Sequence, residues 1–438
     1  MTTKITRTGT TPTNTNKYTW SAWIKRGQVG VGESILYNYA DGNNRGYIAF
    51  DASNKLFFYD KVGSEQNNCY STRKLRDTFG WYHLHIKTDS TLGSDRFVVH
   101  INGVRETITG TTIDQNDTLG FKVATGSGQH SIGTNADSTA NPFTGILSHV
   151  HYVDGLAIAH TEFGETDATT GEWKIKTSPT VSEYGANGYF ILKDGNSLTD
   201  QSGKGNNFAL ATGTLTNTED CPSDVFATWN NLHNGFESAT YSCGNTKTTT
   251  GGSGKYTWNN STLGMIAGKY YMELRWVSGG TDALFGITDR FSNNSTEELG
   301  NYATQYAYRN NGQIYTNNSG SAWGSTFAIG DIVGIAVDMD NNKLYFSKNG
   351  TWENSGDPTS GATGTGAVSI SASPQNGCYY FSICGYDDAS MVFEANFGNG
   401  YLGTTAVTSA GTNASGIGIF EYDVPTGYSA LSTKGLNK

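Results

Sequence analysis

The sequence predicts an all-β protein made of two antiparallel β-sandwiches of the jelly-roll type, joined by an extended connector. The chain has 438 residues, more than the roughly 250 to 300 residues at which one hydrophobic core usually stops growing. Its composition favours strands and turns, with 56 Gly, 25 Tyr, 20 Phe and 9 Trp but only 16% charged residues. Short runs in which apolar and polar residues alternate recur along the chain, and we find no long helical period.

The first sandwich is expected at residues 18–160, after an N-terminal arm at residues 1–17. The arm is rich in Thr and Asn without a hydrophobic period, so we expect it to serve attachment or to be disordered. In residues 18–26 every second residue is apolar, which predicts a strand with one face in a core, and Trp23, which breaks the alternation, is expected under a second layer. Further strands are expected at residues 81–87, 96–101 and 143–153, and an Asn-Gly hairpin turn follows the second of them.

A connector, a second sandwich and a C-terminal segment are expected to follow. Residues 161–235 are first acidic and Thr-rich and then rich in turn residues, which is typical of a connector. The second sandwich is expected at residues 236–400, where residues 270–276 alternate and Asn341-Asn342 and Asn349-Gly350 predict hairpin turns. Residues 401–438 remain as the C-terminal segment.

Charge and hydropathy exclude several functions. The formal net charge is −10 without any basic run, which argues against nucleic-acid binding, because that binding depends on clustered Lys and Arg. The first 20 residues lack the apolar core of a secretory signal, and no stretch approaches the roughly 18 apolar residues of a membrane span. We therefore expect synthesis in a host cytoplasm and no membrane insertion. Five dispersed cysteines, expected as buried thiols, fit neither a disulfide framework nor a zinc site: Cys69, Cys221, Cys243, Cys378 and Cys384.

Two blocks of motifs resemble known domain families. The first block resembles laminin-G-like modules of the concanavalin A-like type through residues 18–26 (YTWSAWIKR), 81–84 (WYHL), 99–103 (VHING), 145–150 (GILSHV) and 152–155 (YVDG). The second block resembles a SPRY domain through residues 268–273 (GKYYME), 285–287 (FGI), 330–338 (GDIVGIAVD), 344–350 (LYFSKNG) and 395–398 (ANFG). The resemblance implies that both sandwiches are concanavalin-like.

The order of the two modules, the connector and the closing residues 424–432 (VPTGYSALS) resemble virion proteins of marine tailed phages over nearly the whole chain. This resemblance implies a structural protein on the particle surface, such as a tail-fibre or other appendage component, with lectin-like modules for attachment to host-surface glycans. Its implied partners are other virion proteins and further copies of itself. One alternative is a capsid decoration or head-fibre protein with a purely structural role. The other is a polysaccharide depolymerase.

We expect no enzyme and no catalytic residue. Retaining glycosidases need two carboxyl groups about 5 Å apart. The nearest sequence match, Glu421 and Asp423, lies in the C-terminal segment without a third acid. A nucleophile elbow and a phosphate-binding loop are both missing. A pair of carboxylates in a cleft would instead favour the depolymerase.

No metal or cofactor is expected either. His83 and His85, and likewise His149 and His151, have the i, i+2 spacing that projects two rings from one strand face. Partly buried, hydrogen-bonded histidines are commoner than metal ligands, so packing is the preferred interpretation. The loop at residues 41–44 (DGNN) offers oxygen ligands for Ca²⁺, but a turn is the simpler interpretation.

One ligand site is predicted, for a glycan. A sugar is bound by aromatic faces against its apolar side and by amides or carboxylates at its hydroxyls. Trp323 and Trp352 lie in loop sequence rich in Gly, Ser and Asn, and Asn354 and Asp357 follow the second of them. The alternative for both tryptophans is core packing at the end of a sandwich.

Overall fold

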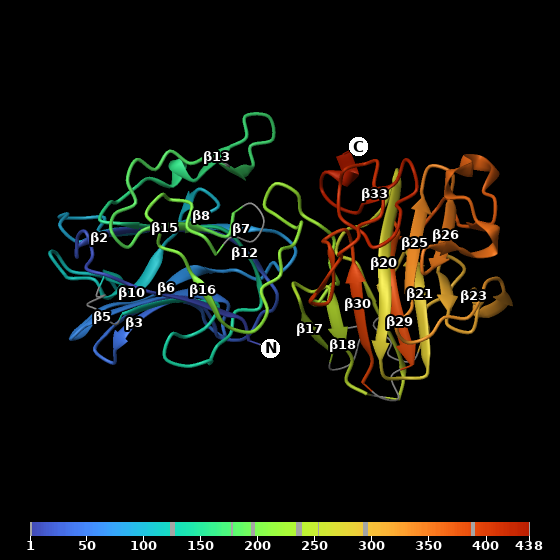
Figure 1. Ribbon diagram of the computed structural model, residues 1–438, viewed down its shortest axis with the longest axis horizontal. Coiled ribbons are helices and arrows are strands. Elements are labelled where there is room, and N and C mark those ends of the chain that lie inside the picture. Colours follow the sequence, from blue (N-terminus) through green and yellow to red (C-terminus); the bar gives the residue numbers. More distant parts are fainter. Residues whose placement is uncertain are drawn as a thin grey trace. The chain divides into compact units, whose positions relative to one another are not determined.

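The computed structural model describes residues 2–122, 128–176, 178–193, 198–233, 239–252, 254–291, 297–386 and 390–437. It divides into two compact units, Met1–Asn217 and Thr218–Lys438, and each is built from antiparallel sheets (Figure 1). The all-β prediction is confirmed, since the described helices are short 3-10 turns. None of the helices described is long and apolar enough to cross a lipid bilayer.

The first unit packs an eight-stranded sheet against a six-stranded sheet. The eight strands are, in spatial order, β10 (Ile108–Thr111), β6 (Ser64–Lys74), β5 (Lys55–Val62), β4 (Asn44–Phe50), β3 (Glu33–Asp41), β11 (Gln129–Ile132), β1 (Lys4–Thr8) and β16 (Ala209–Thr212). The six strands are β15 (Tyr189–Ile191), β12 (Gly145–Asp154), β2 (Lys17–Arg26), β7 (Tyr82–Asp89), β8 (Phe97–Ile101) and β9 (Val104–Arg105).

Alternation along β2 sets which face of the six-stranded sheet is buried in the sandwich. Trp20 and Ile24 enter the core between the sheets, as their period of two predicts. Trp23 points the other way and stacks on His83 with 4.9 Å between ring centroids. His83 in turn stacks on Trp173 of residues 155–188, the covering segment, which includes η2 (His160–Glu162), β13 (Gly164–Thr166) and β14 (Trp173–Ile175) and lies over this sheet (Figure 1). Trp23 is thus under a second layer.

The expected arm and connector are instead parts of the folded units. β1 comes from residues 1–17 and is hydrogen-bonded to β11 on one side and to β16 on the other. Residues 161–217 supply most of the covering segment together with β15 and β16 and complete the first sandwich. The rest of the expected connector belongs to the second unit, whose core includes Trp229. Strands of three to five residues are too short to show a period in sequence, and pairing with longer strands orders them. The expected start of the second sandwich at residue 236 lies outside the described residues.

The second unit is also a sandwich of two sheets around one core. One sheet has the order β17 (Thr240–Ser242), β18 (Lys247–Thr249), β30 (Val392–Asn396), β20 (Lys269–Ser278), β25 (Ile332–Asp338), β26 (Lys343–Lys348) and β27 (Thr351–Trp352), with β28 (Val368–Ser369) paired to β26 and β33 (Ser429–Ala430) to β20. The other has the order β19 (Tyr256–Asn260), β29 (Tyr380–Tyr386), β21 (Asp282–Thr288), β22 (Tyr306–Arg309), β23 (Gln313–Thr316) and β24 (Ser319–Ala322).

The C-terminal segment forms a third layer on the second sandwich. Phe420 and Tyr428 pack against Tyr271 on the outer face of β20. The buried carboxylate of Glu273 accepts hydrogen bonds from the backbone N–H groups of Glu421 at 2.9 Å and Tyr422 at 2.8 Å. Residues 401–438 are therefore bound to the sandwich rather than separate from it.

The five cysteines are free thiols, but burial holds for only two of them. Cys69 and Cys384 are buried, whereas the other three are half-buried: Cys221, Cys243 and Cys378. These three lie in short turn-rich stretches of the second unit, where little packing surrounds a side chain.

Candidate binding site

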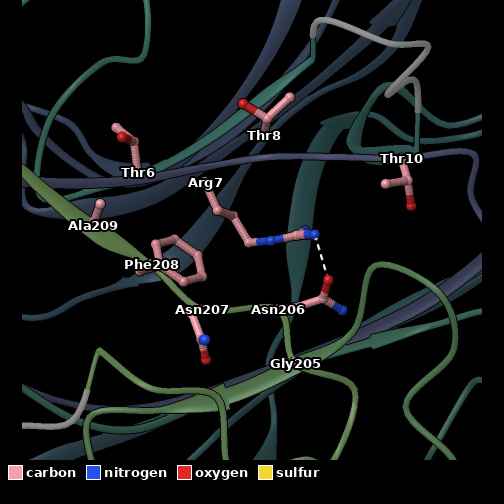
Figure 2. A pocket seen from close by; sticks show the side chains of 9 residues that line it. All are labelled: Thr6, Arg7, Thr8, Thr10, Gly205, Asn206, Asn207, Phe208 and Ala209. Atoms are coloured by element: carbon pink, nitrogen blue, oxygen red, sulfur yellow. Dashed lines mark hydrogen bonds between the residues drawn. The ribbon is translucent and has the colours of Figure 1, made fainter.

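A hollow of about 560 Å³ lies beside β1 in the first sandwich. One wall is residues 6–10 of β1 and its continuation, and the other is residues 205–209, which lead into β16. Figure 2 shows the Arg7 side chain extending from β1 towards Asn206, whereas Thr6 and Thr8 project away from it on the other side of the strand. The two walls are about 200 residues apart in the sequence, and pairing of β1 with β16 joins them.

Arg7 is the charged group of this hollow. It faces the sandwich interior, opposite His130 of β11, and only 8% of the residue is exposed. Its Nη2 donates to Asn206 Oδ1 at 2.6 Å and its Nη1 donates to the Asn187 carbonyl at 3.3 Å. Burial lowers the pKa of Arg7 below its ordinary value, because removal from water disfavours the charged form.

The second wall is a turn organised by Asp200. The Asp200 carboxylate accepts hydrogen bonds from Phe190 N, Ser202 N, Ser202 Oγ and Asn206 N, each at 2.8 or 2.9 Å. The Asp200 N–H donates to Asn207 Oδ1 at 2.8 Å. This turn holds Asn206 against Arg7 and leaves the exposed Asn207 amide on the lining of the hollow. A cation, side-chain amides and the Phe208 ring thus line one hollow, although the Asn207 side chain extends away from Arg7 (Figure 2), and these groups can serve a polar ligand.

Sequence reasoning missed this site for two reasons. Residues 6–10 were expected in a disordered arm, and residues 205–209 in or next to a run of turn residues within the connector. The one usable signal was that turn itself: Asp200 followed by two neighbouring Asn residues is typical of a side-chain-capped loop with a fixed shape.

The two tryptophans of the predicted glycan site lie on opposite faces of β26. The half-buried Trp323 packs against Phe346, which belongs to the core between the sheets, with 5.8 Å between ring centroids. The half-buried Trp352 packs against Tyr345, which belongs to the cluster under the C-terminal segment, with centroids 6.5 Å apart. Successive strand residues point to opposite faces, so the two rings do not form one sugar-binding platform.

Asn354 and Asp357 shape the loop after β27. Asn354 has φ of 54°, and its Nδ2 donates to the Gly366 carbonyl at 3.4 Å. The Asp357 carboxylate accepts from Thr359 N at 2.8 Å and from Thr359 Oγ1 at 2.6 Å, which caps η4 (Pro358–Thr363). Both side chains are exposed and engaged in the turn, so the structure places them near Trp352 but not near Trp323.

Five histidines meet between the six-stranded sheet and the covering segment: His83, His85, His100, His151 and His160. The i, i+2 pair His83 and His85 does share one face, as its spacing predicts. His83 accepts from Trp173 Nε1 at 2.9 Å, and His85 Nε2 lies 3.0 Å from the Ile158 carbonyl. Across the residues the structure describes, no group of three or more His, Cys, Asp or Glu is placed to hold a metal ion.

The acidic loop considered for Ca²⁺ is a tight turn between β3 and β4. Asp41 Oδ1 accepts from Asn43 N at 2.7 Å, and both carboxylate oxygens accept from Asn44 Nδ2. These amide donors lower the pKa of Asp41, and the side chain of Asn44 has the largest effect. The carboxylate therefore already has donors that stabilise its charge.

Two family models match the chain. Residues 2–162 match the concanavalin A-like lectin/glucanases superfamily, and residues 269–385 match the SPRY domain. The chain therefore carries a concanavalin A-like domain followed by a SPRY domain.

Similar proteins share only parts of the chain. The dual specificity protein kinase splA of Dictyostelium discoideum is 37% identical over 86 residues, which are 19% of this chain and 3% of that protein. The Ran-binding proteins 9/10 homolog of Drosophila melanogaster is 29% identical over 86 residues, 19% of this chain and 9% of that protein. The chain thus spans less than a tenth of either relative.

Solved structures with a similar fold are distant in sequence. The SPRY domain of human HERC1 has a TM-score of 0.31 at 16% identity, covering 38% of this chain and 96% of that one. A heptameric SAP-like pentraxin from Limulus polyphemus has a TM-score of 0.29 at 15% identity, covering 36% of this chain and 72% of that one.

Proposed function

We propose that this chain is a non-enzymatic binding protein on the surface of a tailed-phage particle, and that its concanavalin A-like domain attaches to host-surface glycans. The hollow beside β1 carries the glycan part of the proposal. It brings the Arg7 guanidinium, two Asn amides and an aromatic ring together in a domain that matches a lectin/glucanase superfamily. Amide and cationic donors around a sugar-sized space are what recognition of several hydroxyl groups requires.

Binding of the full chain to an array of host-surface and reference saccharides tests this function. Hydrogen exchange with and without the saccharide that binds best locates the contact. We expect slower exchange at residues 6–10 and 205–209 on binding. Binding that protects other segments alone would refute the hollow as the site, and the absence of any saccharide binding would refute the glycan proposal.

The particle role is supported by the resemblance to marine phage virion proteins in the order of the two domains and in residues 424–432. We propose a tail-fibre or other appendage component that assembles as a homo-oligomer with other virion proteins as partners. Cryo-electron microscopy of intact particles, with this chain located by its density, is the test. Density at a tail tip or fibre is the expected result, a regular array on the capsid shell would favour decoration, and absence from the particle would overturn the virion role.

The depolymerase alternative requires paired acids in a cleft. Asp423, one of the two acids of the nearest sequence match, accepts hydrogen bonds from Thr412 N at 2.6 Å and Thr412 Oγ1 at 2.8 Å, which is a turn-capping arrangement. Release of new reducing ends from host polysaccharide by the purified chain would favour the depolymerase over the binding protein.

A further inference from the structure

Arg7 is a buried cation without a carboxylate partner among the described residues. The acceptors within hydrogen-bond distance of its guanidinium are neutral: the side-chain oxygen of Asn206 and the carbonyl of Asn187. Transferring a charged group out of water is costly unless an opposite charge or several good hydrogen bonds compensate it. Asp200 and Asp154 attract Arg7 through space, but none of the described carboxylates accepts a hydrogen bond from its guanidinium.

Arg26 in the same sandwich shows how this chain compensates a buried arginine. Its Nη2 lies 3.0 Å from Glu33 Oε2, and both side chains are 0% exposed. Arg26 also donates to the Leu75 carbonyl at 2.6 Å and lies over the Phe50 ring. Arg7 has the carbonyl and the amide but no counterpart of Glu33.

The two acids nearest to Arg7 are already engaged elsewhere. The Asp200 carboxylate accepts from four donors within the turn described above. Asp154 Oδ2 accepts from Thr13 N at 2.8 Å and Asn187 N at 3.0 Å. These donors occupy both carboxylates, and among the described residues neither acid forms an ion pair with Arg7, although both attract it through space.

We infer that the hollow binds a carboxylate of an acidic saccharide, which supplies the missing charge beside Arg7. This inference rests on the proposed glycan-binding function and names the class of glycan. A carboxylate matches the planar fork of a guanidinium and forms short, charge-assisted hydrogen bonds with it. Asn207, whose Oδ1 accepts from the Asp200 N–H, is exposed on the lining of the hollow, so its Nδ2 group is available to donate to a sugar oxygen. Phe208 provides the apolar wall.

Titration calorimetry with the full chain tests the inference through matched pairs of ligands. Sialyllactose and trigalacturonate are each compared with their methyl esters, which keep the sugar and remove the charge. We expect each acid to bind roughly tenfold to a hundredfold more tightly than its ester, the range of one charge-assisted hydrogen-bond pair. Equal binding of acid and ester would overturn the inference and leave the proposed glycan-binding function intact. If no saccharide binds, the proposed function itself fails.

Two variants place the charge at this hollow. Arg7→Gln should remove the preference for acid over ester, whereas Arg96→Gln, the same change of charge in the same sandwich but outside the hollow, should keep it. Asn207→Asp is isosteric, retains an acceptor for the Asp200 N–H, and should weaken the acid selectively by repulsion. Competition by sodium sulfate at equal strength would indicate a general anion site and overturn the saccharide assignment. A preference that survives Arg7→Gln and Asn207→Asp would overturn the location.

Discussion

Lowering the pH from 7 to 5 should loosen the covering segment of the first sandwich, and His83 should account for about 2 kcal/mol of the lost stability. His83 is 0% exposed between Trp23 and Trp173. Its Nε2 lies 2.8 Å from Ser21 Oγ, and its Nδ1 accepts from the Trp173 indole N–H at 2.9 Å. An indole can only donate, so Nδ1 stays unprotonated in the docked state.

The magnitude follows from the pKa of His83. Burial, followed by the neighbouring His160 and His100, lowers this pKa to about 3 from its ordinary value of 6.5. The folded state therefore binds its proton less readily than the unfolded chain. The stability from neutral His83 is fully present above pH 6.5 and is lost as the pH falls from 6.5 towards 3. The loss is about 2 kcal/mol at pH 5 and at most about 5 kcal/mol in strong acid.

Hydrogen exchange of residues 155–188, corrected for intrinsic rates, and denaturant unfolding at pH 7 and pH 5 measure this effect. His83→Gln removes the titration and keeps one acceptor and one donor on the side chain. We expect its unfolding free energy to fall by about 2 kcal/mol less than that of the wild type over this range. Parallel pH profiles for wild type and His83→Gln would refute the reasoning.

Changes at Gly164, at Glu273 and at the two loop tryptophans also have expected outcomes. Gly164→Ala should lower the free energy of opening of the covering segment by about 1 to 3 kcal/mol, because the new Cβ would lie 2.5 Å from Trp173 Cζ2. Unchanged hydrogen exchange of this segment would contradict the prediction. Burial is the largest cause that raises the pKa of Glu273, which is about 7. The unfolding free energy of the second sandwich should therefore fall by up to about 3 kcal/mol as the pH rises from 4.5 to 7. Glu273→Gln should abolish that slope in urea unfolding. Trp323→Ala should lower the unfolding free energy by about 2 kcal/mol. Trp352→Ala should speed hydrogen exchange at residues 411–424. Loss of saccharide binding in both variants would instead support a sugar site shared by the two tryptophans.

The long strands could be predicted from sequence because alternation needs several residues to become visible. β2 and β20 each span ten residues, and their alternate side chains enter the two cores as expected. β1 and β16 span five and four residues, and the outer positions of β1 are Thr. Because Arg7 occupies an inward position of β1, the inward face of this strand does not show as a run of apolar residues in the sequence. These segments become strands because their neighbours supply hydrogen-bonding edges, and local sequence contains no record of that.

The site was harder to predict than the fold for a related reason. Loop composition indicated that Trp323 and Trp352 lie near turns, which is where the structure places them. It did not indicate which face of β26 each ring meets, since that depends on the exit angle of a turn. The hollow depends on pairing between residues 4–6 and 209–212, a contact that no local pattern can indicate.

The two buried arginines of the first sandwich differ in their partners, since Arg26 is paired with Glu33 and Arg7 donates to no described carboxylate. Arg26→Met would leave the Glu33 carboxylate buried without its partner and should cost about 3 to 5 kcal/mol of unfolding free energy. Arg7→Met removes a charge that forms no ion pair with a described carboxylate. Asn206 is half-exposed, so water can replace the donor that it loses. We therefore expect the free Arg7→Met chain to stay within about 1 kcal/mol of the wild type while its preference for acidic saccharides disappears. Urea unfolding of both variants measures this. A loss at Arg7 as large as that at Arg26 would mean that the guanidinium serves the fold, and the case for a ligand in the hollow would fall with it.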